Sequence, residues 1–145
     1  MKISRRQRKM TEYTHKVQYY ETDKMSIVHH SNYIRWFEEA RIDWLEKAGC
    51  DMKTIEAAGV LIPVMSVTCN YHSMVRFGDS VIVKTKVETF NGVKTVFTYE
   101  IVDDKTGELR NTGSSTHCFI DENGKLISLK KYNVEMYEKL AGFVD

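Results

Sequence analysis

The sequence has few cysteines, one proline and no long apolar run. Its three cysteines, Cys50, Cys69 and Cys118, form no Cys-x-x-Cys pair, which argues against a disulfide framework or a zinc knuckle and favours reduced thiols in a cytoplasmic protein. No stretch of about 18 consecutive apolar residues occurs, so no membrane-spanning helix is expected. The single proline, Pro63, is expected near the start or at the edge of a strand, because it cannot donate a ladder hydrogen bond.

Excess charge of either sign is also missing, since the formal net charge of the 145 residues is only +1. The exception is the segment 1–10, which holds five Lys or Arg and no acid. Such a segment can attract nucleic acid or anionic lipid, but a mobile basic tail is the favoured interpretation. No nucleic-acid partner is therefore expected, and residues 11–145 are expected to form one domain.

Three common catalytic fingerprints are absent: the P-loop, the Gly-x-Gly-x-x-Gly loop and the Gly-x-Ser-x-Gly elbow. Phosphoryl transfer, dinucleotide binding and α/β-hydrolase chemistry therefore lose support. No cofactor is expected. Zinc patterns with helix-spaced ligands are absent as well, so a metal site at Asp23, His29 and His30 is disfavoured.

The strongest periodic pattern predicts a long helix. Apolar residues recur at spacings of three and four over 33–48, as one buried helix face requires. Ser31 or Asn32 can cap its start, and Gly49 stands where a helix commonly ends. A shorter helix is expected over 51–59.

Runs rich in β-branched and aromatic residues predict five strands, mostly antiparallel. The dipeptide Asn91-Gly92 is typical of a two-residue hairpin turn, and a short helix is expected over 134–140. One apolar helix stripe and an antiparallel sheet can bury each other, which predicts an α+β domain. The expected strands cover residues 12–20, 60–76, 81–90, 94–102 and 109–121.

The polar segment 21–31 leads directly into the long helix. A helix start exposes unpaired N–H groups and the positive end of the helix dipole, so it can hold an oxyanion. Asp23 lies a few residues upstream, where its carboxylate could attack an acyl carbon or activate water. The alternative is that Asp23 is only a loop carboxylate in an Asx-turn. Glu38 and Glu39, on the helix itself, are expected mainly on its solvated face.

The motif Tyr-Tyr-Glu-Thr-Asp-Lys-Met-Ser-Ile-Val-His-His-Ser-Asn-Tyr at 19–33, followed by Phe-Glu-Glu-Ala-Arg at 37–41, closely resembles the 4-hydroxybenzoyl-CoA thioesterase family of hotdog proteins. Its bacterial acyl-CoA thioesterase branch is the most similar. The resemblance implies a hotdog fold, in which an antiparallel sheet of about five strands wraps around one long helix. It also implies homodimers that pair their sheets, often assembled into homotetramers, with active sites at the subunit interface.

The implied reaction is hydrolysis of an acyl-CoA thioester to a carboxylic acid and coenzyme A. The family's catalytic aspartate corresponds to Asp23, and the residue whose backbone N–H polarises the carbonyl corresponds to His30. The His30 side chain can orient groups or handle protons, or contribute nothing beyond its backbone. Tyr19 matches a tyrosine implicated in the bacterial branch. Ser26 stands where the family usually has glycine, so the loop either avoids a positive φ or carries strain.

For the coenzyme A phosphates the resemblance suggests Lys94 and, more weakly, Arg76. The acyl group is expected near Tyr33 and Phe37, which core packing explains equally well. Two other functions stay open: a thioesterase acting on acyl groups of acyl carrier protein, and a non-catalytic acyl-thioester binding protein.

Overall fold

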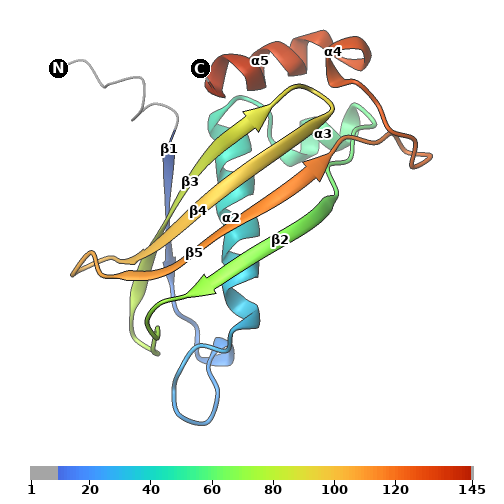
Figure 1. Ribbon diagram of the computed structural model, residues 1–145. Coiled ribbons are helices and arrows are strands. Elements are labelled where there is room, and N and C mark those ends of the chain that lie inside the picture. The colour runs from blue at the N-terminus through green and yellow to red at the C-terminus, as the bar shows by residue number, and fades with distance from the viewer. Residues whose placement is uncertain (1–9, 145) are drawn as a thin grey trace, which may run out of the picture.

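The computed structural model describes residues 10–144. One long helix packs against one face of a five-stranded antiparallel sheet, and two helices lie over one end of both (Figure 1). The expected α+β fold, with about five strands and one long helix, is confirmed. The strands are β1 (Met10–Lys16), β2 (Val64–Tyr71), β3 (Ser80–Phe90), β4 (Lys94–Asp103) and β5 (Leu109–Cys118); the helices are η1 (Tyr19–Glu21, a 3-10 turn), α2 (Ser31–Lys47), α3 (Met52–Ala57), α4 (Leu129–Tyr132) and α5 (Val134–Val144).

The sheet has the strand order β1-β3-β4-β5-β2, and every neighbouring pair is antiparallel. Strands β1 and β2 therefore form its two edges. The chain places the start of α2, the residues around η1 and the β2–β3 connection at one end of the molecule. The β3–β4 hairpin and α5 occupy the opposite end (Figure 1).

Helix α2 contributes large aromatic residues to the hydrophobic core. Its inner face buries Trp36, Phe37 and Trp44 almost completely, and each such burial stabilises the fold by about 1.5–3 kcal/mol. Phe37 stacks on Tyr99 with ring centroids 4.3 Å apart. The sheet approaches this ring so closely that a Cβ on Gly113 would lie 2.6 Å from it. Glycine is therefore required at that point of β5.

A chain of hydrogen bonds crosses the core beneath α2. The Arg41 guanidinium donates to the Tyr99 hydroxyl (3.1 Å), which lies 2.6 Å from Ser115 Oγ. Ser115 Oγ is in turn 2.7 Å from His117 Nε2. His117 is fully buried, and desolvation, with Arg41 nearby, lowers its pKa to about 4.

Three expected strands were too long, and the one expected over 109–121 ends at Cys118. The first, expected over 12–20, ends at Lys16 because Tyr19–Glu21 winds into a 3-10 turn. The strand expected over 60–76 shortens to β2, since Pro63 directly precedes it and offers no N–H for pairing. The expected position of Pro63 at a strand start is confirmed.

Turn and helix ends also differ from expectation in detail. The β3–β4 connection has three residues, 91–93, instead of two, because the Asn91 side chain accepts hydrogen bonds from the Val93 and Lys94 N–H groups. The C-terminal helix is longer than expected, and α4 before it was not foreseen. Asp51 caps α3 as expected, accepting the Thr54 N–H at 2.8 Å.

The basic segment expected as a tail, residues 1–10, lies outside the described residues except for Met10, which begins β1 and pairs with Lys86. All three cysteines are free, as expected. Within residues 10–144, no helix is both long and apolar enough to cross a membrane.

Candidate active site

Asp23 sits at the tip of a narrow hairpin between η1 and α2. Thr22 and Val28 pair as an antiparallel bridge, the Asp23 N–H donates to Ile27 O (2.9 Å), and the Ser26 N–H donates back to Asp23 O (3.1 Å). The Asp23 carboxylate accepts the Met25 N–H at 3.0 Å and is exposed. The Asx-turn considered from the sequence is therefore present, and it leaves the rest of the carboxylate open to solvent.

Ser26 adopts a positive φ of 59°. In a tight hairpin of this kind the last turn residue takes the left-handed conformation, which glycine adopts without steric cost. The loop thus keeps the geometry that a glycine would allow, and Ser26 carries the strain.

Glu21, two residues before Asp23, is the centre of a buried polar cluster that the sequence analysis did not single out. Its side chain is 4% exposed and accepts hydrogen bonds from the Gln18 N–H (2.7 Å) and the Trp36 indole (2.6 Å). Its Oε1 also lies 2.8 Å from His15 Nε2. Burial alone would raise the pKa of Glu21, but the bonds from Gln18, His15 and Trp36 outweigh it and hold the pKa below its usual value.

The backbone of Glu21 fixes the start of α2. Its carbonyl accepts the His29 N–H and the Asn32 side-chain amide, each at 2.9 Å. The second ring nitrogen of His15 lies 2.9 Å from Glu39, so Glu39 is not simply a solvated residue. Glu21 therefore ties the hairpin of Asp23 to strand β1 and to helix α2.

The start of α2 differs from the expected cap. Ser31 and Asn32 are its first two residues, and His30 before them forms no side-chain cap. Instead, His29 Nδ1 faces the Ser31 N–H (3.3 Å) and hydroxyl (2.8 Å). Within residues 10–144, the His30 N–H has no hydrogen-bond partner. An unpaired N–H at the positive end of a helix dipole is suited to an oxyanion.

A surface cavity of about 260 Å³ adjoins this helix start and includes both His30 and Tyr33. The Tyr71 hydroxyl donates to the His30 carbonyl (3.1 Å), and its ring meets Tyr33 edge to face. Desolvation raises the pKa of Tyr71 to about 12, with Cys69 and Tyr33 adding to the effect, so the hydroxyl stays protonated. Tyr33 itself is almost fully buried. Phe37 is core and does not reach this cavity.

Tyr19 and Arg76 lie on the outer side of the same hairpin. Tyr19 is 73% exposed and packs edge-on against Phe77, whose N–H donates to Ser26 O (3.0 Å). Arg76 pairs with Ile27 as an isolated bridge and is exposed. Among the described residues, no hydrogen bond or ion pair joins Asp23 to Tyr19 or His30.

Lys94 lies elsewhere. It begins β4 in the hairpin at the opposite end of the sheet from the Asp23 loop (Figure 1). One chain therefore does not bring Lys94 to the start of α2. No group of three His, Cys, Asp or Glu side chains within residues 10–144 could hold a metal ion.

Comparisons with known proteins identify the family of this chain. The family model of the thioesterase-like superfamily matches residues 17–140. Over 116 residues the chain is 37% identical to YneP of Bacillus subtilis (strain 168), whose name proposes an acyl-CoA thioesterase; the match covers 79% of this chain and 83% of YneP. The acyl-CoA thioester hydrolase YbgC of Escherichia coli O157:H7 is 28% identical, covering 61% of this chain and 66% of YbgC.

Among solved structures, the DHNA-CoA thioesterase of Staphylococcus aureus superposes with a TM-score of 0.87 at 35% identity, covering 92% of this chain and 89% of that one. The protein TT1821 of Thermus thermophilus gives a TM-score of 0.83 at 31% identity, covering 92% and 97%. The chain therefore belongs to the thioesterase-like superfamily and is a thioester hydrolase of hotdog fold.

Proposed function

We propose that the protein hydrolyses acyl-CoA thioesters, with Asp23 as the reacting carboxylate and the start of α2 as the oxyanion site. The observation that carries this proposal is the His30 N–H at the helix start, which has no hydrogen-bond partner within residues 10–144 and directly follows a hairpin that presents an exposed carboxylate. Developing negative charge on the carbonyl oxygen would be stabilised by this N–H and by the helix dipole. Relatives named for acyl-CoA hydrolysis support coenzyme A as the carrier.

Two versions of the chemistry fit Asp23. As a general base, its carboxylate takes a proton from water while the water oxygen attacks the carbonyl carbon. The tetrahedral intermediate then expels the thiolate of coenzyme A and leaves the carboxylic acid. As a nucleophile, the Asp23 carboxylate attacks the carbonyl carbon and displaces the thiolate of coenzyme A, forming a mixed anhydride; water then hydrolyses the anhydride, releasing the carboxylic acid and restoring Asp23. Thiolate is a good leaving group, so neither version needs a strong general acid.

His30 and Tyr19 have supporting roles in this proposal. The His30 ring lies tilted against His29, with ring centroids 4.2 Å apart, and is exposed beside the cavity. It can orient the thioester, while its backbone N–H holds the oxyanion. Tyr19, on the outer side of the hairpin, can contact the substrate next to Asp23.

The residues proposed to bind the substrate lie at the two opposite ends of the sheet. Tyr33 lines the cavity beside His30, where the acyl carbonyl would lie. Arg76 is at the same end and can meet a phosphate of coenzyme A. Lys94 is at the other end, so it can serve only the site that a second copy of the chain helps to form.

The second copy is proposed to join at strand β2. This edge strand exposes Val64 (51%) and Met65 (54%), together with Val67 and Tyr71. An unpaired strand edge with apolar side chains is a ready template for another strand. A homodimer would pair two β2 strands into one continuous sheet, and a homotetramer would require a further contact between dimers. The three free cysteines fit a reducing compartment such as the cytoplasm.

The decisive experiment compares Asp23→Asn with the unchanged protein. Asparagine keeps an oxygen that can accept the Met25 N–H, so the turn is retained while the charge is lost. Release of free thiol from a panel of acyl-CoAs should fall at least about a hundredfold, with an unchanged circular dichroism spectrum. Full activity in Asp23→Asn would refute the catalytic assignment. The same acyl group offered on acyl carrier protein tests the choice of carrier.

A further inference from the structure

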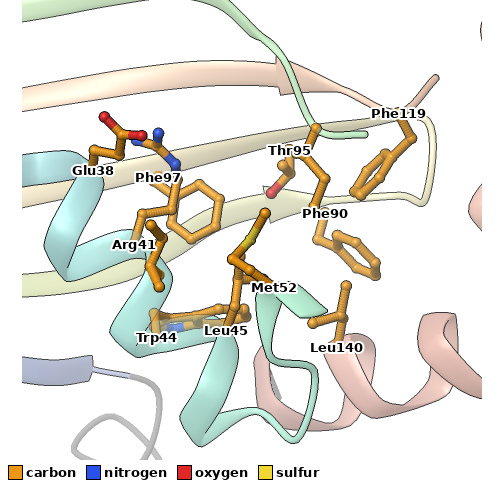
Figure 2. A pocket seen from close by; sticks show the side chains of 12 residues that line it. Glu38, Arg41, Trp44, Leu45, Met52, Phe90, Thr95, Phe97, Phe119 and Leu140 are labelled. Atoms are coloured by element: carbon orange, nitrogen blue, oxygen red, sulfur yellow. The ribbon is translucent and has the colours of Figure 1, made fainter. Parts of the chain in front are cut away.

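A second cavity, of about 120 Å³, lies at the far end of α2 from the Asp23 hairpin. It is enclosed by the C-terminal half of α2, the β3–β4 hairpin and helix α5 (Figure 2). Phe90, Phe119 and Leu140 form one side, and Glu38 and Arg41 form the other (Figure 2). Phe119 and Leu140 are almost completely buried, whereas Glu38 is exposed. The cavity therefore has an apolar closed end and a polar mouth.

The closed end offers a ligand apolar contacts from Phe90, Phe119 and Leu140, whereas the Trp44 indole N–H, elsewhere in the cavity lining, has no hydrogen-bond partner within residues 10–144. Thr95, the polar residue nearest to it, already donates to Thr89 O at 3.0 Å. Arg41, at the mouth, is held by its hydrogen bond to Tyr99 and by the chain through Ser115 to His117. The charged head is thereby kept at the mouth. A polar group pushed to the closed end would lose its hydration without compensation.

The size of the cavity indicates the size of its occupant. An engineered apolar cavity of about 150 Å³ holds one benzene molecule, so 120 Å³ suits roughly six carbon atoms. A void of this size inside a core destabilises a protein, and close-packed interiors rarely retain one. Its presence here is explained if a ligand fills it during function.

The position of the mouth relates this cavity to the proposed reaction. Glu38 lies seven residues beyond Ser31, the first residue of α2, which places the mouth about 10 Å along the helix axis from the helix start. An acyl group whose carbonyl is held at the helix start reaches the mouth only if it is a long chain. A short acyl group ends before the mouth.

We propose that this cavity binds the terminal six or so carbons of a linear, unsubstituted acyl chain, and that it selects medium- and long-chain thioesters over short ones. The inference rests on the proposed function and extends it to the substrate class. It places the end of the acyl chain under α5, distant from Tyr33 and Phe37. It also predicts discrimination against chains with a polar terminus.

The first experiment uses the unmodified protein and three substrates: butanoyl-CoA, tetradecanoyl-CoA and tetradecanedioyl-CoA. We expect kcat/KM for tetradecanoyl-CoA to exceed both others by at least about tenfold, since one methylene in an apolar pocket already changes kcat/KM measurably. Tetradecanedioyl-CoA has the same chain length but ends in a carboxylate. Equal turnover of tetradecanoyl-CoA and tetradecanedioyl-CoA would overturn the proposal.

The second experiment fills the cavity. Leu140→Phe should lower kcat/KM for tetradecanoyl-CoA at least about tenfold and leave butanoyl-CoA unaffected. Met52→Phe fills the same space from a half-buried position, in case Leu140→Phe weakens the packing of α5. Val134→Phe is the matched control, because Val134 lies on α5 but is exposed outside the cavity. Equal losses on both substrates in the two filling variants would contradict the proposal.

A binding measurement separates this inference from the proposed reaction. Decanoate should raise the unfolding midpoint of the Asp23→Asn protein, and Leu140→Phe in the same background should abolish the rise. If this binding occurs but no thioester is hydrolysed, the proposed function fails and the cavity assignment stands. If all chain lengths are hydrolysed equally and decanoate does not bind, the cavity assignment fails and the proposed function stands.

Discussion

The buried cluster around Glu21 and the exposed turn around Asp23 adjoin in sequence but differ in almost every physical respect. Glu21 is enclosed and bonded to Gln18, Trp36 and His15. Among the residues that the structure describes, the Asp23 side chain makes one hydrogen bond, within its own turn. A carboxylate with every oxygen engaged can hold a structure together, whereas a carboxylate with free lone pairs can meet a substrate. The motif therefore combines an anchor and a reactive group within three residues.

The largest expected effect on the free energy of unfolding comes from removing the Glu21 carboxylate. Glu21→Ala leaves the Trp36 indole and the Gln18 N–H without an acceptor and His15 without one of its two carboxylates. The loss should be about 3–5 kcal/mol in the free energy of unfolding, as for other broken buried charge pairs. Urea denaturation measures it. A loss below about 1 kcal/mol would show that solvent replaces these contacts.

The Glu21 carboxylate should also make the free energy of unfolding depend on pH in the acidic range. Because the pKa of Glu21 is lower in the folded state, its contribution is complete above its unfolded pKa and is lost as the pH falls through the lower folded value. The free energy of unfolding of Glu21→Gln should therefore fall less steeply in this range. Parallel curves for both proteins would contradict the prediction.

His117 extends the comparison to a buried group with few polar partners. Its pKa is lowered from 6.5 to about 4 by desolvation and by Arg41, so the folded state favours the neutral ring. Stability is complete above pH 6.5 and falls by about 3 kcal/mol as the pH falls to about 4. Replacing His117 with Gln should remove this decrease. Urea titrations at the two pH values measure the difference.

A smaller effect is expected in the Asp23 turn. Ser26→Gly removes the cost of a side chain at positive φ, about 1–2 kcal/mol, but adds unfolded-state entropy of about 0.5–1 kcal/mol. A net gain of about 0.5 kcal/mol in the free energy of unfolding should result. Ser26→Ala keeps the strain and is the control, with no gain expected.

The smallest effect on stability should follow from changing Asp23 itself. Asp23→Asn keeps the hydrogen bond to the Met25 N–H, and the side chain is exposed, so the change in unfolding free energy should stay below about 0.5 kcal/mol. Together with Glu21→Ala, this variant tests whether anchor and reactive group are separable. A large loss of stability in Asp23→Asn would show that they are not.

The sequence allowed the fold to be predicted more completely than the site. The helix of residues 33–48 and the β-rich second half follow from periodicity, which depends only on local geometry. Strand ends were less accurate, because Tyr19–Glu21 has strand-like side chains but is bent by bonds to Gln18 and His15.

The site required tertiary contacts that spacing does not reveal. The two-sided position of His15, between Glu21 and Glu39, depends on how β1 crosses α2. The resemblance assigns Lys94 to the phosphates of coenzyme A, and within one chain it lies at the opposite end of the sheet from Asp23. The cavity beneath α5 could not be foreseen, since it depends on where a late helix returns to the sheet.

The exposed edge of strand β2 makes the assembly and the aggregation of newly made chains depend on protein concentration. Its exposed apolar side chains and unpaired backbone groups can join any compatible strand. At high local concentration, correct assembly competes with aggregation from the moment the sheet forms. Dilution reduces aggregation but also favours dissociation of the proposed dimer, so a site that needs two chains becomes incomplete. Specific activity and recovery on refolding should therefore both depend on protein concentration, in opposite senses.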